Sequence, residues 1–290
     1  MVDVTQIVLI IDIITMLIVI ILSTAYIIPI IFIRRFQTTY NILTGNICLT
    51  ILIASVFWIT FNTLTVYNAS AMKQSIIACY ITAYFPAYVN CSTVYAVVVV
   101  TMNRFFAIVY PNKRFFKTQA WCFISLSIQW MVAILAPLPR LIFPLQTCQY
   151  KSLTPYWRYV YNILIIVLLP AILNAIFNVL IVKNVRSSTR RIHAGIVDTN
   201  VSTNAQQNSA RDVHLLKHIS FIFIISVIGW APVYLYEAIT ANPSAIQWLF
   251  IMLQILPVFS LFINIVDLFL YNHNLRKFLK ERLLNCICIK

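Results

Sequence analysis

The chain has 290 residues, of which 61% are hydrophobic and only 10% are charged. Soluble domains are nearer to about 45–50% apolar and about 25% charged, and one core of this size cannot cover so much apolar surface. The composition therefore excludes a soluble globular enzyme, a disordered chain and a fibrous protein, and it predicts a protein that folds in lipid. In a membrane protein the net charge of +14 indicates basic inner loops, so no nucleic acid partner is expected.

Seven runs of apolar residues are long enough to cross a bilayer, which takes about 20 helical residues. The predicted spans are residues 7–33, 42–66, 75–109, 120–139, 157–182, 214–236 and 246–271. The fold class is therefore an all-α membrane protein, with a seven-transmembrane helix bundle over residues 1–271 and an amphipathic eighth helix with a tail over residues 272–290. The longest break, about 186–210, is rich in Ser, Thr, Asn and Gln and predicts a flexible loop.

Basic residues are distributed unevenly between the two sets of loops. The breaks after the first, third and fifth spans, together with the tail, hold 17 of the 21 Lys and Arg residues. Such residues favour the cytoplasmic side of a membrane. We therefore expect a multi-pass protein of the plasma membrane with its N-terminus outside and its C-terminus inside. Asn68, in the sequon of the first outer loop, is then the predicted glycosylation acceptor.

The segment after Tyr271 combines apolar and basic side chains at helical spacing. One face carries Leu275, Phe278, Leu279 and Leu283, and four basic residues surround it. This pattern predicts a helix that lies on the inner leaflet beside the lipid bilayer. Cys286 and Cys288 follow this helix, and we expect both to be palmitoylated.

Three motifs, taken in chain order, resemble those of class A, rhodopsin-like G-protein-coupled receptors. The segment from Asn103 to Pro111, at the end of the third span, resembles the DRYxxIVxP signature. In the sixth span, Gly229-Trp230-Ala231-Pro232 resembles CWxP. In the seventh, residues 267–271 followed by an aromatic residue at 278 resemble D/NPxxY with its distal Phe. Trp130 and Pro170 also match landmarks of the fourth and fifth spans, so the resemblance covers nearly the whole chain.

The resemblance implies a disulfide bond on the outer side and a G-protein-binding region at the inner end of the third span. Cys79 lies 25 residues before Arg104, where the family has an outer cysteine, and Cys148 is its implied disulfide partner in the oxidising exterior. Asn103 and Arg104 are implied to lie where the G protein couples. An arginine inside a membrane usually has a partner, and for Arg104 the implied one is Asp212, in a lock that joins the third and sixth spans at rest.

An activation switch is implied for Trp230, Pro232, Asp267 and Tyr271. Pro232 removes a backbone hydrogen bond and kinks the sixth span. Trp230 is expected one turn away at the floor of a pocket, where a ligand that presses on it can bias the kink between two packings.

Four positions depart from the family pattern. Asn103 replaces the acid of the DRY motif, Ile51 replaces a second-span Asp, Ser23 replaces a first-span Asn and Leu268 replaces the seventh-span Pro. Because Asn103 is neutral, the resting state lacks the attraction between an acid at this position and Arg104, so raised basal signalling is expected. Because Ile51 removes the main carboxylate of a sodium site, we expect no bound metal and no cofactor, with Asp267 hydrogen-bonding between helices instead.

A ligand pocket is predicted at the outer end of the spans. Its expected residues are Asn90, Tyr159, Asn162, Tyr234 and Glu237, with Arg140 nearer the rim. Amine receptors of the family carry an Asp where Pro86 stands, and opsins carry a Lys where Leu261 stands, which disfavours monoamines and retinal. The mixed, aromatic-rich mouth favours a short peptide with a basic group at Glu237, as in neuropeptide receptors. A chemosensory receptor for small molecules is the alternative.

The function implied is transduction of extracellular ligand binding into activation of a heterotrimeric G protein. Arrestin is expected to bind through the third inner loop, because the tail after Tyr271 has no Ser or Thr. A channel or transporter is the rival class, but it requires a charged route through the bilayer, and the spans hold Asp12, Asp267 and little else. A membrane enzyme is disfavoured because the four His residues are spread apart without metal-ligand spacing.

Overall fold

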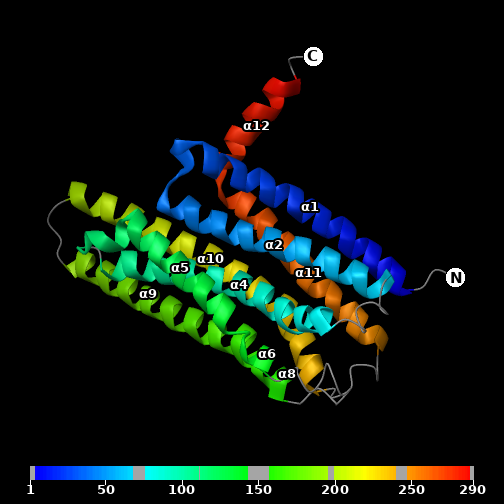
Figure 1. Ribbon diagram of the computed structural model, residues 1–290. Coiled ribbons are helices and arrows are strands. Elements are labelled where there is room, and N and C mark those ends of the chain that lie inside the picture. The colour runs from blue at the N-terminus through cyan, green and yellow to red at the C-terminus, as the bar shows by residue number, and fades with distance from the viewer. Residues whose placement is uncertain are drawn as a thin grey trace.

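The computed structural model describes residues 4–67, 76–110, 112–142, 157–194, 199–239 and 247–287, and every regular element in these ranges is helical (Figure 1). The elements are α1 (Val4–Phe32), η1 (Arg34–Phe36), α2 (Thr39–Tyr67), α4 (Ile76–Val109), η2 (Arg114–Lys117), α5 (Gln119–Leu135), α6 (Pro139–Ile142), α8 (Trp157–Asn162), η3 (Ile163–Leu168), α9 (Leu169–Ala194), α10 (Thr199–Ile239), α11 (Gln247–Tyr271) and α12 (His273–Ile287).

Seven membrane-length apolar helical segments occur within the part of the chain that the structure describes. They cover residues 6–32, 39–64, 80–109, 119–141, 159–184, 217–239 and 252–271, which confirms the predicted seven-helix fold class. The fourth span contains α5 and α6, and the fifth contains most of α8, η3 and α9. The long helices lie side by side, with α4 packed against α2, α5 and α9, and with α11 between α1 and α10 (Figure 1).

The outer surface of the bundle is apolar, as the lipid solvent requires, and its mainly hydrophobic core also contains buried polar side chains. Ile21 and Phe32 on the outer surface are 67% and 78% exposed. Inside, the Asn46 amide donates to the Gln129 carbonyl oxygen at 2.9 Å, and the Trp130 indole donates to Asn46 at 3.1 Å. Gln129 in turn donates to the backbone carbonyl of Ser92 at 3.1 Å. This network joins α2, α4 and α5 and satisfies these amide groups within the bundle.

A π-helical segment, η3, immediately precedes Pro170 in the fifth span. In the π register the carbonyl of Ile165 accepts from the N–H of residue 170, and proline has none. The Tyr95 hydroxyl of α4 donates to this carbonyl at 3.1 Å. A side chain of α4 thus supplies the hydrogen bond that Pro170 removes from the fifth span.

The predicted flexible loop at about 186–210 is wrong for most of its length. Helix α9 continues to Ala194 and α10 begins at Thr199, so that only residues 195–198 lie outside the described part of the chain. The segment contains no proline and a single glycine, Gly195. Nothing in its backbone chemistry therefore stops the helices, although its polar composition resembles that of a loop.

The amphipathic helix after the seventh span is confirmed as α12. The side chain of Asn272 accepts from the N–H of Leu275 at 3.3 Å and so caps α12. Its amide also donates to the Tyr26 hydroxyl and to the Asn41 side chain, both at 3.1 Å. The Phe278 ring packs against Phe36 with centroids 5.4 Å apart. Helix α12 is thereby held against α1, η1 and α2 at one end of the bundle, here named the α12 end.

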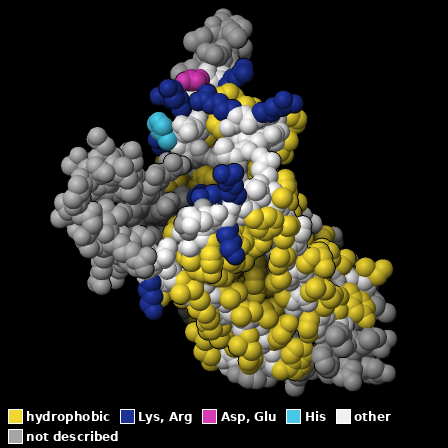
Figure 2. All heavy atoms as spheres, turned by 90° about the vertical axis from the view of Figure 1, so that its left-hand side faces the viewer, with side chains coloured by type: hydrophobic (Ala, Val, Ile, Leu, Met, Phe, Trp, Pro, Cys, Tyr) yellow, Lys and Arg dark blue, Asp and Glu magenta, His cyan; other side chains and the backbone are white. Residues whose placement is uncertain are grey.

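Lys and Arg side chains gather at the α12 end, around the base of α12 and beside it, while the flank below them is covered by hydrophobic side chains (Figure 2). Basic groups lie beside lipid headgroups more readily than within hydrocarbon, so this distribution agrees with seven helices that cross a bilayer.

Candidate functional site

A cavity lies between the helices at the end of the bundle opposite α12, and each of the seven spans contributes at least one lining residue. It holds about 610 Å³ of empty space, counting the part that opens to the outside. Five of the six predicted pocket residues line it: Asn90, Arg140, Asn162, Tyr234 and Glu237. Tyr159 is not among the lining side chains.

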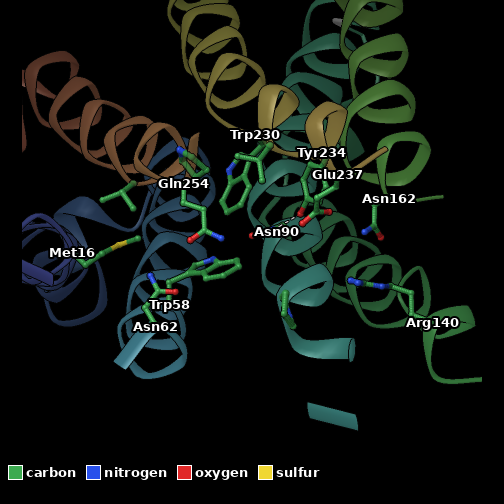
Figure 3. A pocket seen from close by; sticks show the side chains of 14 residues that line it. Met16, Trp58, Asn62, Asn90, Arg140, Asn162, Trp230, Tyr234, Glu237 and Gln254 are labelled. Atoms are coloured by element: carbon green, nitrogen blue, oxygen red, sulfur yellow. Dashed lines mark hydrogen bonds between the residues drawn. The ribbon is translucent and has the colours of Figure 1, made fainter. Parts of the chain in front are cut away.

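Sequence reasoning missed the half of the cavity formed by the first, second and seventh spans. There Met16, Trp58, Asn62 and Gln254 line the wall (Figure 3). The sequence held a signal for two of these four positions. Asn62 and Gln254 are polar side chains within apolar helices, and such residues usually face the bundle interior.

Arg140 and Glu237 place opposite charges on the same cavity. Glu237 comes from α10 and Arg140 from the short helix α6, whose side chain extends toward the side of the cavity that holds Asn162 and Glu237 (Figure 3). Among the side chains that the structure describes, no ion pair within 4.0 Å joins these two residues. The Nε atom of Arg140 is buried and has no hydrogen-bond partner.

Tyr234 and Asn90 connect α10 with α4 beside these charges. The Asn90 amide donates to the Tyr234 hydroxyl, and both side chains are buried. The carbonyl oxygens of Asn90 and Asn162 are also buried and accept no hydrogen bond. Tyr234 and Glu237 share one face of α10 because they lie three residues apart.

Trp230 lies beside Tyr234 and forms part of the cavity wall. It is 5% exposed, and its ring centroid is 5.8 Å from that of Trp58 and 6.1 Å from that of Tyr234. The adjacent Gly229 allows α10 to approach α11 closely, since a Cβ atom there would lie 2.5 Å from the Ser260 side chain. The sequence motif marked Trp230 and Pro232, but the packing role of Gly229 is visible only in the structure.

At the α12 end, five side chains from four helices form one contact series. The Arg104 guanidinium of α4 lies over the Tyr40 ring of α2, 4.8 Å from its centroid. Tyr40 is 6.2 Å from Tyr271 of α11, and Tyr271 stacks on His218 of α10 with centroids 3.8 Å apart. His218 Nε2 then lies 2.8 Å from Asp267 Oδ2 of α11. This series is named the coupling cluster below.

The predicted lock between the third and sixth spans pairs Arg104 with Asp212. Asn103 is buried beside Arg104, and the side chain of Asp212 lies outside the described part of the structure. Asp267 contacts His218 of the neighbouring helix, whereas Asn264 donates to the Ser226 hydroxyl at 2.9 Å. The described residues include no group of three or more His, Cys, Asp or Glu side chains that could hold a metal ion.

The structure does not describe the side chains predicted to carry the glycan, the disulfide and the palmitate groups. Asn68, Cys148 and Cys288 lie outside the described residues, as do the side chains of Cys79 and Cys286.

Comparisons with known proteins agree with the seven-span architecture. The family model described as 7 transmembrane receptor (rhodopsin family) matches residues 10–271. This range extends from within the first span to the last residue of the seventh. A comparison with curated proteins gives no match.

Proposed function

The chain belongs to the rhodopsin family of seven-transmembrane receptors, and we propose that it converts the binding of an extracellular ligand into activation of a heterotrimeric G protein. Members of this family are signalling receptors and not enzymes, and the chain is a multi-pass membrane protein. The observation that supports the proposal best is the separation of two polar sites, the cavity shared by all seven spans and the coupling cluster. In α4, Asn90 and Arg104 lie 14 residues apart, which corresponds to about 21 Å of helix.

The cavity end faces the exterior and the α12 end faces the cytoplasm of a cell whose plasma membrane holds the receptor. The support is the concentration of Lys and Arg at the α12 end (Figure 2). With this orientation a ligand reaches the cavity from outside, and a G protein meets Arg104 and its neighbours from inside.

The ligand is a short peptide, as in neuropeptide receptors. A cavity that combines charges, carboxamides and aromatic rings offers the mixed polar and apolar contacts that a peptide requires. Glu237 is the group that pairs with a basic part of the ligand. A small-molecule, chemosensory ligand is the second candidate, because a concave site with apolar and aromatic walls and a few polar groups also suits a small molecule.

Activation is a population shift between two packings of α10 against its neighbours. A ligand that contacts Trp230 changes the packing of α10 near Pro232, and the far end of the helix moves away from α11 and α4. At rest that end is held by the contact of His218 with Asp267 and by a pairing of Arg104 with Asp212. Because Asn103 is neutral, it does not attract Arg104 as an acid would, and basal signalling is therefore raised.

The other predicted sites complete the receptor. A disulfide between Cys79 and Cys148 restrains the second outer loop, Asn68 carries a glycan, and Cys286 and Cys288 carry palmitate. Arrestin binds phosphorylated Ser and Thr residues of the third inner loop, which lie in the cytoplasmic ends of α9 and α10. Sequence context alone supports these assignments.

The purified chain in lipid nanodiscs, mixed with a panel of heterotrimeric G proteins, tests the proposal. Nucleotide exchange on at least one Gα subunit should exceed that with empty discs even without ligand. Replacement of Arg104 by Met should lower it. Absence of exchange with every G protein, together with ion or solute flux through the chain in liposomes, would instead identify a channel or transporter.

A further inference from the structure

Two described side chains of opposite charge line the cavity without a close ion pair between them. Arg140 and Glu237 both line it, yet they form no ion pair within 4.0 Å among the described side chains. Burial of a charge away from water is unfavourable unless another group compensates it. A ligand that carries both charges can compensate both residues at once.

Several polar atoms of the residues that line the cavity are buried without a hydrogen-bond partner. The carbonyl oxygens of Asn90 and Asn162 are buried acceptors without a donor, on the side of the cavity where Glu237 lies (Figure 3). The buried Nε of Arg140 is a donor without an acceptor. A buried polar atom without a partner costs free energy that a bound group recovers. An ammonium group fits the acceptors, and a carboxylate fits the arginine.

We propose that the part of the ligand which enters this cavity is a zwitterion, with an ammonium group at Glu237, Asn90 and Asn162 and a carboxylate at Arg140. The inference rests on the proposed function, because it names the ligand class of that same cavity. A free amino acid and a short peptide with free ends share this chemistry. A plain amine or a fatty acid leaves one of the two protein charges unpaired, which is the physical basis for rejecting it.

The opposite half of the cavity indicates what the zwitterion carries beside its charges. Beside the amides of Asn62 and Gln254, the side chains of Met16, Trp58 and Trp230 present apolar and aromatic surface there, with the Trp58 and Trp230 centroids 5.8 Å apart (Figure 3). Aromatic rings bury large apolar areas in defined geometry. The ligand class is therefore a zwitterion with an apolar or aromatic side chain, placed so that the side chain presses on Trp230.

Thermal stabilisation of the purified chain tests this inference directly. The probes are phenylalanine, Phe-Gly and Gly-Phe, and the tripeptide Gly-Phe-Gly, each with free ends, N-acetylated, C-amidated and doubly blocked. A free-ended probe should stabilise the protein, and either block should weaken its apparent affinity at least about tenfold. The length that binds best separates an amino acid from a peptide as the source of the zwitterion.

Two variants test which protein residue pairs with each charged group of the ligand. Arg140→Gln should remove the preference for carboxylate over amide and keep that for free amine over acetyl, and Glu237→Gln should do the reverse. Matched controls are Arg282→Gln and Glu281→Gln, which change the same charges on exposed residues of α12. If Arg140→Gln does not fold, Arg140→Lys retains the charge, and the comparison of blocked with free probes on the natural chain needs no variant.

The outcomes separate this inference from the proposed function. Equal binding of blocked and free probes, or no stabilisation by any of the free-ended probes, overturns the zwitterion even if G-protein exchange is observed. Stabilisation by free-ended probes alone supports the zwitterion, even if no G protein responds and the proposed function fails.

Discussion

His218 Nε2 of α10 lies 2.8 Å from Asp267 Oδ2 of α11, within ion-pair distance although without good hydrogen-bond geometry. The His218 ring also stacks on Tyr271, one turn further along α11. The carboxylate of the seventh-span motif is thus engaged with the sixth span at the α12 end. In the proposed mechanism this contact opposes the separation of α10 from α11, so its loss should favour the active packing.

Loss of the contact between His218 and Asp267 should raise basal signalling. His218→Phe keeps a ring to stack on Tyr271 but removes Nε2, and Asp267→Asn removes the charge. A loss of about 1 kcal/mol shifts a two-state equilibrium about fivefold, so ligand-free nucleotide exchange should rise by that order. The double variant should add little to either single variant, and His273→Phe on α12 serves as the control. Unchanged basal exchange in both single variants would show that the contact does not hold the resting packing.

An acid at position 103 should have the opposite effect. Asn103→Asp places a carboxylate beside Arg104, which favours the resting packing through an attraction at short range. Ligand-free nucleotide exchange should fall several-fold. Asn103→Ser, which stays neutral, should leave it near the level of the natural chain. If the Asp variant signals as strongly as the natural chain, the neutral residue is not the cause of raised basal activity.

A methyl group at Gly229 should destabilise the bundle. The added Cβ would lie 2.5 Å from the Ser260 side chain and 3.2 Å from the Leu256 carbonyl oxygen, so Gly229→Ala forces α10 and α11 apart. Overpacking of this kind costs about 1–3 kcal/mol, and the thermal midpoint in detergent should fall. Gly45→Ala is the matched control, since its Cβ meets only the flexible end of Ile30 at 3.3 Å.

A second substitution at the contact partner distinguishes steric strain from lost backbone freedom. Ser260→Gly removes both atoms that the new methyl group would strike, so it should restore part of the midpoint lost in Gly229→Ala. No recovery in the double variant would place the cost elsewhere than in this approach of two helices.

Removal of the Tyr95 hydroxyl should destabilise the protein, because Pro170 has no N–H to replace the lost hydrogen bond. Tyr95→Phe leaves the Ile165 carbonyl without a donor in a buried site, at a cost of about 1–3 kcal/mol in the free energy of unfolding. In a Pro170→Ala background the new N–H can donate to that carbonyl, and the cost of Tyr95→Phe should shrink. Equal costs in both backgrounds, measured by thermal unfolding, would show that the hydroxyl does not substitute for the missing N–H.

The polar segment between the fifth and sixth spans shows where composition misleads. Its Ser, Thr, Asn and Gln residues are typical of loops, yet α9 and α10 continue through most of it. Polarity reports only that a segment does not lie in hydrocarbon. Whether it is helical depends on breakers, of which it has only Gly195.

The amino-acid sequence by itself determined the solvent, the number of spans, the amphipathic α12 and most of the polar side of the cavity. These features depend on local sums, because a helix enters lipid when about 20 consecutive residues are apolar, and a motif marks its own place in a helix. Only the tertiary structure decided that Met16 and Trp58 complete the cavity, that Gly229 meets Ser260 and that His218 meets Asp267. Such contacts depend on the rotation and spacing of helices, which the packing of many side chains sets together and no single segment records.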